Sequence, residues 1–233
     1  MELEQSQWVN HFQGSSCLTT KVGLIHTLKN SVFFSNRRDD TFFPRSYDLA
    51  KEIHEFVTDF LCLQTITNLQ QLLEKSKVHR YSANGQLKVN HGLVSFQLRF
   101  LERQYQNKKF QLGLVEGCIR CNDITTFEFE LLRNCHTLLR REVSRSELEN
   151  FIDSGAKRYL GKTKKYKDDW DKNKFKKSRR IIEKLAPRVS CTQPLNDIMI
   201  EKVNKTLEEC FTYMYQDQKE INGITSNNLW IVK

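Results

Sequence analysis

The positive charge of this chain is concentrated in one segment. Between Lys157 and Lys184 there are 13 Lys or Arg residues and 4 acidic residues, so the segment contributes 13 − 4 = +9, which equals the net charge of the whole chain, +9. The rest of the sequence is therefore close to neutral, and such a segment indicates one local anionic partner. Aromatic residues are interleaved with the charges: Tyr159, Tyr166, Trp170 and Phe175.

Three interpretations of this basic segment are open. The rings could stack on bases while the cations meet phosphates, as in nucleic-acid binding. The same cations could equally meet the carboxylates of an acidic protein tail. The third interpretation is a solvated helix face or a disordered loop with no ligand. No motif of an RNA- or DNA-binding module accompanies the segment.

A second candidate is the Lys at the end of the sequence. Residues 228–233, Asn-Leu-Trp-Ile-Val-Lys, predict a strand that presents the ammonium group of Lys233. Such a Lys can hold a nucleotide phosphate as a point charge. No turn or cap follows it, so we expect the chain to stop within a site that it does not complete.

Four cysteine and histidine residues have part of the spacing of a zinc site, but their second pair does not fit it. Cys118 and Cys121 have the spacing of a ligand pair, but Cys135 and His136 are adjacent within a predicted helix. Neighbouring helical residues point about 100° apart and rarely chelate one ion, so buried free thiols are the favoured interpretation and no metal site is expected. The sequence also contains no HExxH, GxSxG, Walker A or GxGxxG motif.

Length and composition favour a folded intracellular protein. At 233 residues with 39% hydrophobic residues, the chain can form one large domain or two small ones. No apolar run approaches the roughly 18 to 20 residues of a membrane span, and no secretory signal is visible at the N-terminus. Seven Cys residues at irregular spacing then fit a reducing cytoplasm.

Hydrophobic periodicity predicts the elements that would position these residues. Helices are expected at about 48–75, 93–105, 123–140 and 197–214, and a short helix capped by Thr19-Thr20 is expected through Leu24 and Leu28. Ser144 and Glu147 fit a capping box at the start of a further helix. Together with the terminal strand, these elements predict a mixed α/β (α+β) fold.

Four stretches in order then carry a family resemblance. They are Trp-Val-Asn-His-Phe at 8–12, Leu-Thr-Thr-Lys-Val-Gly-Leu at 18–24, Asp-Thr-Phe-Phe-Pro-Arg-Ser-Tyr-Asp-Leu at 40–49, and the terminal 228–233. In these stretches the chain resembles the tubulin tyrosine ligase-like family, specifically its glycylating branch, the tubulin monoglycylases. The resemblance is strongest in residues 8–60 and 226–233.

This resemblance implies an ATP-grasp-type ligase, of which the chain would be the helix-rich N-terminal and central part. Such enzymes use ATP and Mg²⁺ to phosphorylate a carboxylate, and an amine then forms the amide; in glycylases these are a tubulin tail Glu and glycine. Lys233 matches the family's nucleotide-binding Lys, and the rest of the ATP site would lie beyond it. We therefore expect the chain to be truncated and inactive alone, and its catalytic residues stay unassigned.

The resemblance also favours the acidic-peptide interpretation of the basic segment over nucleic acid. The implied partner is the acidic C-terminal tail of tubulin, and the implied location is the cytoplasm and cytoskeleton, including cilia and axonemes. The alternative function is a non-catalytic module that binds microtubules or acidic peptides. The expected divisions are 1–80, 81–156, 157–184 and 185–233. Residues expected to bind the substrate tail are Lys162, Lys164, Lys165, Lys176, Lys177, Arg179 and Arg180.

Overall fold

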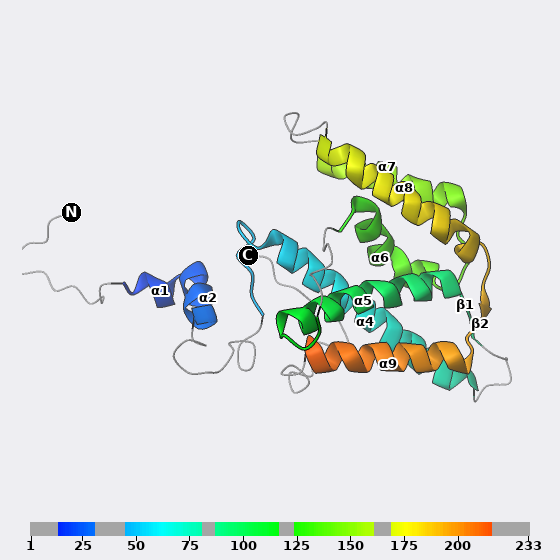
Figure 1. Cartoon of the computed structure of the whole chain (residues 1–233), viewed down its shortest axis with the longest axis horizontal. Helices are drawn as coiled ribbons and strands as arrows, with labels where there is room; N and C mark the ends of the chain where they lie inside the picture. The colour runs from blue at the N-terminus through cyan, green and yellow to red at the C-terminus, as the bar shows by residue number, and fades with distance from the viewer. Residues whose placement is uncertain (1–13, 31–44, 81–86, 117–123, 161–168, 216–233) are drawn as a thin grey trace, which may run out of the picture. The chain divides into compact units, whose positions relative to one another are not determined.

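A computed structural model (Figure 1) describes five ranges of the chain: 14–30, 45–80, 87–116, 124–160 and 169–215. Side chains are described in these ranges except at 79–80, 153–160 and 169–174. The predicted strand at 228–233 lies outside the described residues. The chain divides into two compact units, Met1–Val57 and Thr58–Lys233.

The first unit contains two short helices joined by a tight turn. They are α1, Ser16–Thr19, and α2, Lys21–Asn30. The Gly23 amide donates to Thr20 Oγ1 at 3.0 Å, so Thr20 caps α2 as predicted. A Cβ atom on Gly23 would lie 2.3 Å from the Ser16 carbonyl oxygen, so this turn has no room for a side chain. The cap formed by Thr20 and the close approach of Gly23 to α1 together explain why Thr and Gly stand three residues apart here.

Polar contacts close the first unit. Neither α1 nor α2 has a buried residue, but Lys29 Nζ lies 2.6 Å from Glu52 Oε1. The Asp48 amide donates to Glu52 Oε2 at 2.8 Å. Burial alone would raise the pKa of Glu52, but the bonds from Lys29 and Asp48 together hold it below its usual value. This clamp ties α2 to the segment that precedes the long helix.

The second unit is a helical assembly with one small sheet. Its elements, in order, are α4, Ile53–Arg80, which begins in the first unit; β1, Lys88–Val89; α5, His91–Gln111; α6, Thr126–Leu138; α7, Arg145–Leu160; α8, Asp169–Val189; β2, Gln193–Pro194; and α9, Asp197–Tyr213. The strands pair antiparallel, with Lys88 opposite Pro194 and Val89 opposite Gln193. The mixed fold class is thus confirmed in its coarse form, with helices dominating the described residues.

Helix α5 lies at the centre of the second unit. It packs against α6, α8 and α9, while α7 packs against both α6 and α8 (Figure 1). Its buried residues cover most of the helix circumference and leave one exposed side at Arg99 and Glu102, which is the pattern of an element packed against several others. They are Gly92, Leu93, Val94, Gln97, Leu98, Phe100, Leu101, Gln104, Tyr105 and Asn107.

Two polar contacts connect the ends of elements within this core. Tyr215, just after α9, donates its hydroxyl hydrogen to Asp59 Oδ1 on α4 at 2.9 Å, and both side chains are buried. Lys109 on α5 reaches Glu209 Oε2 on α9 at 2.5 Å and lies 4.2 Å from the ring centroid of Tyr213. Burial opposes the charge of Lys109, but the Glu209 carboxylate raises its pKa above the usual value.

The predicted helices are confirmed, with shifted ends. The helix expected from residue 48 begins at Ile53 because Asp48 forms a turn, in which its Oδ1 accepts from the Ala50 amide at 3.1 Å. The Ser144 hydroxyl accepts from the Glu147 amide at 3.2 Å, as the capping box requires. A complete capping box that the sequence analysis missed joins Thr125 and Glu128 at the start of α6.

Candidate functional site

The described half of the basic segment is an amphipathic part of α8. Ser178, Ile182, Leu185 and Val189 are buried, at intervals of four, three and four residues. This spacing places them on one helical face, which packs onto the core. Most of the remaining residues of this stretch are exposed, and the basic residues are among them or at their border.

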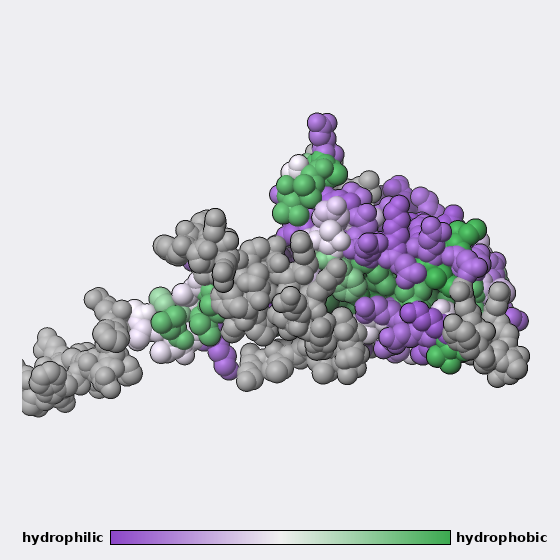
Figure 2. All heavy atoms as spheres, turned by 90° about the horizontal axis from the view of Figure 1, so that it is seen from below, coloured by the Kyte–Doolittle hydropathy of each residue, from purple (hydrophilic) through white to green (hydrophobic). Residues whose placement is uncertain are grey.

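Four exposed cations follow each other at every fourth residue: Lys176, Arg180, Lys184 and Arg188. We call these four residues the α8 ridge, because side chains four apart form a continuous row on a helix surface. Among residues 175–189 there are six Lys or Arg residues and one acid, Glu183, so 6 − 1 = +5. On the face seen in Figure 2, hydrophilic residues cover much of the helical unit, with hydrophobic residues in smaller patches.

Lys177 differs from the ridge because it has an internal partner. Its Nζ lies 3.8 Å from Glu128 Oε2, and the Glu128 side chain is only 6% exposed. The same carboxylate accepts from Arg103 on α5 at 3.2 Å and from the Thr125 amide at 2.9 Å. Lys177 therefore helps to join α8 to α5 and α6, and it is not an independent surface charge.

Arg179 is exposed but lies beside the ridge. Its guanidinium carbon is 5.1 Å from the ring centroid of Phe175, one turn earlier. The ring is 44% exposed and serves as a stacking surface for this Arg. Phe175 is thus occupied within its own helix, and the side chains of Tyr159, Tyr166 and Trp170 lie outside the described residues.

The end of α8 is anchored by contacts to its last backbone carbonyls. The Val143 amide donates to the Val189 carbonyl at 3.0 Å, and Asn90 Nδ2 donates to the same carbonyl at 2.8 Å. A Cβ atom on Gly92 would lie 2.6 Å from the Arg188 carbonyl oxygen. The start of α5 and the end of α8 are therefore in direct backbone contact, which holds the ridge against the core.

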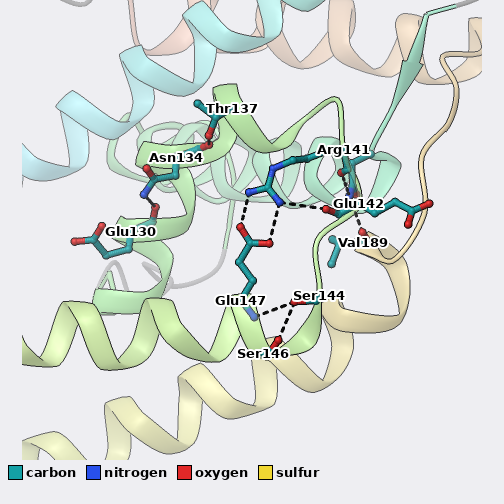
Figure 3. Close-up of polar contacts among 10 residues, drawn as sticks. Glu130, Asn134, Thr137, Arg141, Glu142, Ser144, Ser146, Glu147 and Val189 are labelled. Atoms are coloured by element: carbon teal, nitrogen blue, oxygen red, sulfur yellow. Dashed lines mark hydrogen bonds and ion pairs between the residues drawn. The ribbon is translucent and has the colours of Figure 1, made fainter.

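The turn between α6 and α7 contributes a second anchor (Figure 3). Arg141 forms a two-pronged ion pair with Glu147, bonding Oε2 at 2.9 Å and also reaching Oε1. This contact lowers the pKa of Glu147 and raises that of Arg141, and the Ser144 backbone adds to the effect on Glu147. The pair fixes the start of α7, the helix that packs beside α8.

The predicted divergence of Cys135 and His136 is confirmed. Cys135 is fully buried, and burial raises the pKa of its thiol, whereas His136 is exposed. In the described ranges no three His, Cys, Asp or Glu side chains come together as metal ligands. Cys62 and Cys210 are also buried free thiols, whereas the free thiols of Cys17 and Cys191 are exposed. Cys118 and Cys121 lie outside the described residues.

The expected site residues fall into three groups. Lys162, Lys164, Lys165 and Lys233 lie outside the described residues. Lys176, Arg179 and Arg180 share the exposed side of α8, whereas Lys177 turns toward Glu128. Lys184 and Arg188 complete the ridge and were not among the expected binding residues, although their spacing of four from Arg180 was visible in the sequence.

The fold and the surface together define a mainly helical protein that presents a row of cations on one helix. The chain is similar to tubulin glycylase 3C of Tetrahymena thermophila, with 48% identity over 60 residues, 25% of this chain and 6% of that protein. It is 30% identical over 119 residues to tubulin monoglycylase TTLL3 of Danio rerio, covering 50% of this chain and 15% of the relative. The Mus musculus protein of the same name is 37% identical over 75 residues, 31% and 8% of the two chains.

These similarities confirm the resemblance to the glycylating branch of the tubulin tyrosine ligase-like family. The chain spans only 6% to 15% of the length of these three relatives. No family model matches it, and no solved structure matches it. Among the helices in the described ranges, none has the length and apolar character needed to cross a membrane.

Proposed function

We propose that this chain takes part in the ATP-dependent glycylation of tubulin, with the exposed cations of α8 contacting the acidic C-terminal tail of the substrate. The reaction would join glycine to a Glu side chain of that tail. The location would be the cytoskeleton, including cilia and axonemes. The observation that carries the proposal is the accessible positive surface of α8 in a chain whose relatives are named tubulin glycylases.

Electrostatics supports contact with a polyanionic tail. Within residues 175–189 the exposed basic side chains outnumber the single acidic one, Glu183. Exposed cations attract a flexible chain of carboxylates over a distance of about one Debye length, roughly 8 Å at physiological ionic strength. Such contacts are individually weak, so several must act together. A row of cations on one rigid helix meets this requirement.

ATP and Mg²⁺ belong to the proposal through the family alone. The described residues offer no set of three carboxylate, His or Cys side chains for a metal, and Lys233 lies outside them. Neither group is assigned to residues in the described ranges. What the described residues support is the binding of the substrate tail.

Co-sedimentation of the full chain with microtubules tests the tail contact. We expect pelleting that falls steeply with added salt and is lost when the tubulin tails are removed by proteolysis. Unchanged pelleting after tail removal would reject tail recognition. A variant carrying Arg180→Gln and Lys184→Gln should pellet less than the original chain, whereas Arg133→Gln, on the exposed surface of α6, should not.

Incorporation of labelled glycine separates the two functions that remain. The full chain is incubated with tubulin, ATP, Mg²⁺ and labelled glycine, and the tubulin is analysed for label on its tail. Incorporation supports the ligase. Tail-dependent pelleting without incorporation supports the alternative, a non-catalytic module that binds microtubules or acidic peptides, for which the exposed surface of α8 is the supporting observation.

A further inference from the structure

The spacing of the α8 ridge matches the side-chain spacing of an extended peptide. Consecutive members of the ridge are four residues apart, which corresponds to a rise of about 6 Å along a helix axis. In an extended peptide, side chains on one side recur every second residue, at about 6.6 to 6.8 Å. Each step also turns about 40° around the axis, so the ridge runs obliquely over the helix, inclined by about 26° to its axis. At the helix surface the two repeats are nearly equal, so an extended chain laid obliquely along the ridge can place one side chain opposite each ridge cation.

We propose that the α8 ridge binds an acidic peptide in an extended conformation, with carboxylates on alternate residues meeting Lys176, Arg180, Lys184 and Arg188 in turn. This inference rests on the proposed contact with an acidic tail and adds its register. In a run of consecutive Glu residues, every second carboxylate faces the ridge. The intervening carboxylates face away from the protein and stay accessible.

The other charged residues of this stretch lie outside the ridge. Lys177 is directed to the buried Glu128, at 3.8 Å, and so does not add a cation between the first two ridge positions. Arg179 stacks near Phe175, at 5.1 Å. Glu183 is the one acid on this stretch, and it precedes Lys184 without belonging to the row. A carboxylate placed out of register would lose its partner in the ridge.

Pro187 affects only the final position. It lies inside α8 and has no amide hydrogen to donate to the Glu183 carbonyl, so the last turn is expected to depart from regular geometry. Arg188 lies in this turn. Lys176, Arg180 and Lys184 precede it and therefore carry most of the register.

Two heptapeptides of equal charge test the proposal. One carries Glu at positions 1, 3, 5 and 7 with Ser between them; the other carries four consecutive Glu followed by three Ser. An extended block of four Glu can direct only two carboxylates to the ridge, so it loses two of four ion pairs. Since an exposed pair contributes roughly twofold to fivefold in affinity, the two extra pairs should make the alternating peptide bind roughly fourfold to 25-fold more tightly. Fluorescence anisotropy with the full chain measures both affinities at low salt.

Variants assign any preference to the ridge. Arg180→Gln should reduce the preference for the alternating peptide, because it removes a central position of the row. Arg179→Gln is the matched control: it removes one exposed charge from the same helix, so it should weaken both peptides alike and leave their ratio unchanged. Circular dichroism of each variant checks that the helices are retained, which is expected since both sites are exposed and Gln is a good helix former.

Each outcome has a distinct meaning. Equal affinity for the two peptides would overturn the register while leaving contact with acidic tails intact. Binding of neither peptide, together with tail-independent microtubule pelleting, would overturn the proposed function as well. A preference that survives Arg180→Gln but disappears in Arg179→Gln would move the contact away from the ridge and reject this inference.

Discussion

Asn90 Nδ2 donates a hydrogen bond to the carbonyl oxygen of Val189 at 2.8 Å, joining residues 99 positions apart in the sequence. The same amide nitrogen donates to the Arg141 carbonyl at 3.2 Å, and Asn90 Oδ1 accepts from the Leu93 amide at the start of α5. One fully buried side chain thus connects the start of α5, the turn after α6 and the end of α8. The helix that carries the cationic ridge is positioned by this junction.

Replacing Asn90 by Ala should therefore destabilise the fold strongly. The change removes an N-cap, a buried hydrogen bond to the Val189 carbonyl and a partly buried one to the Arg141 carbonyl, for an expected loss of about 2 to 4 kcal/mol. Urea unfolding followed by circular dichroism measures the difference. Asn196→Ala is the matched control, since Asn196 caps the exposed start of α9 and should cost only about 1 kcal/mol. Equal losses in the two variants would contradict the role assigned to Asn90.

Gly92→Ala should destabilise the protein, although Ala is the better helix former by about 1 kcal/mol. The added Cβ would lie 2.6 Å from the Arg188 carbonyl oxygen and 2.8 Å from Val189 Cγ1. Relieving these contacts requires α5 and α8 to move apart, at a cost of about 1 to 3 kcal/mol. Thermal unfolding compares this variant with Ser95→Ala in the same helix, which should change little. An increase in melting temperature for Gly92→Ala would show that the two helices are not in close contact.

The Arg141–Glu147 pair should stabilise the protein in a pH-dependent manner. The bond from Arg141 lowers the pKa of Glu147 in the folded state below the ordinary 4.5. A carboxyl group with a lowered folded pKa contributes its stability above the unfolded pKa and loses it as pH falls through the folded value. Arg141→Gln should therefore cost up to about 1 kcal/mol at pH 7, since both side chains are partly exposed. The difference from the original chain should shrink in acid below pH 4.5, and a difference that stays constant in urea titrations down to pH 3 would refute the assignment.

Lys177 and Arg180 should separate stability from ligand binding. Lys177→Gln removes a partner of the buried Glu128, so it should lower the unfolding free energy while leaving microtubule pelleting nearly unchanged. Arg180→Gln should do the opposite, with little effect on unfolding and a loss of about twofold to fivefold in binding. Parallel urea and co-sedimentation measurements test both. If the two variants lost binding equally, Lys177 would belong to the contact surface after all.

Thiol reactivity should distinguish the exposed cysteines from the buried ones. Cys17 and Cys191 are exposed, whereas burial raises the pKa of Cys210 to about 12 and also raises that of Cys135. Because the thiolate is the reactive form, a thiol reagent should modify Cys17 and Cys191 in the native protein and Cys135 only after unfolding. Cys17→Ser and Cys191→Ser should each lower the native reaction by one thiol equivalent. Cys135→Ala should leave it unchanged, provided that the variant still folds.

The sequence alone determined the features that depend on local periodicity and composition. Hydrophobic spacing predicted α4, α5, α6 and α9, with the ends of α6 and α9 close and the ends of α4 and α5 up to 111 − 105 = 6 residues away, and Thr20 was recognisable as the cap of α2. The concentration of charge between Lys157 and Lys184 identified the basic segment. Four short stretches carried the family resemblance. Each of these signals lies within a single segment, so none required knowledge of what packs against it.

Only the tertiary structure decided which cations face solvent and what holds their helix in place. Lys176 and Lys177 are adjacent and identical in type, but one is exposed and the other is directed to Glu128, 49 positions earlier in the chain. The two-residue strands at Lys88–Val89 and Gln193–Pro194 are too short to show alternation and exist because their segments meet. The hydrogen bond of Asn90 and the close packing of Gly92 likewise exist only because the end of α8 lies against the start of α5. Burial and hydrogen bonding between distant segments depend on how the helices pack, and hydrophobic periodicity within one segment does not contain that information.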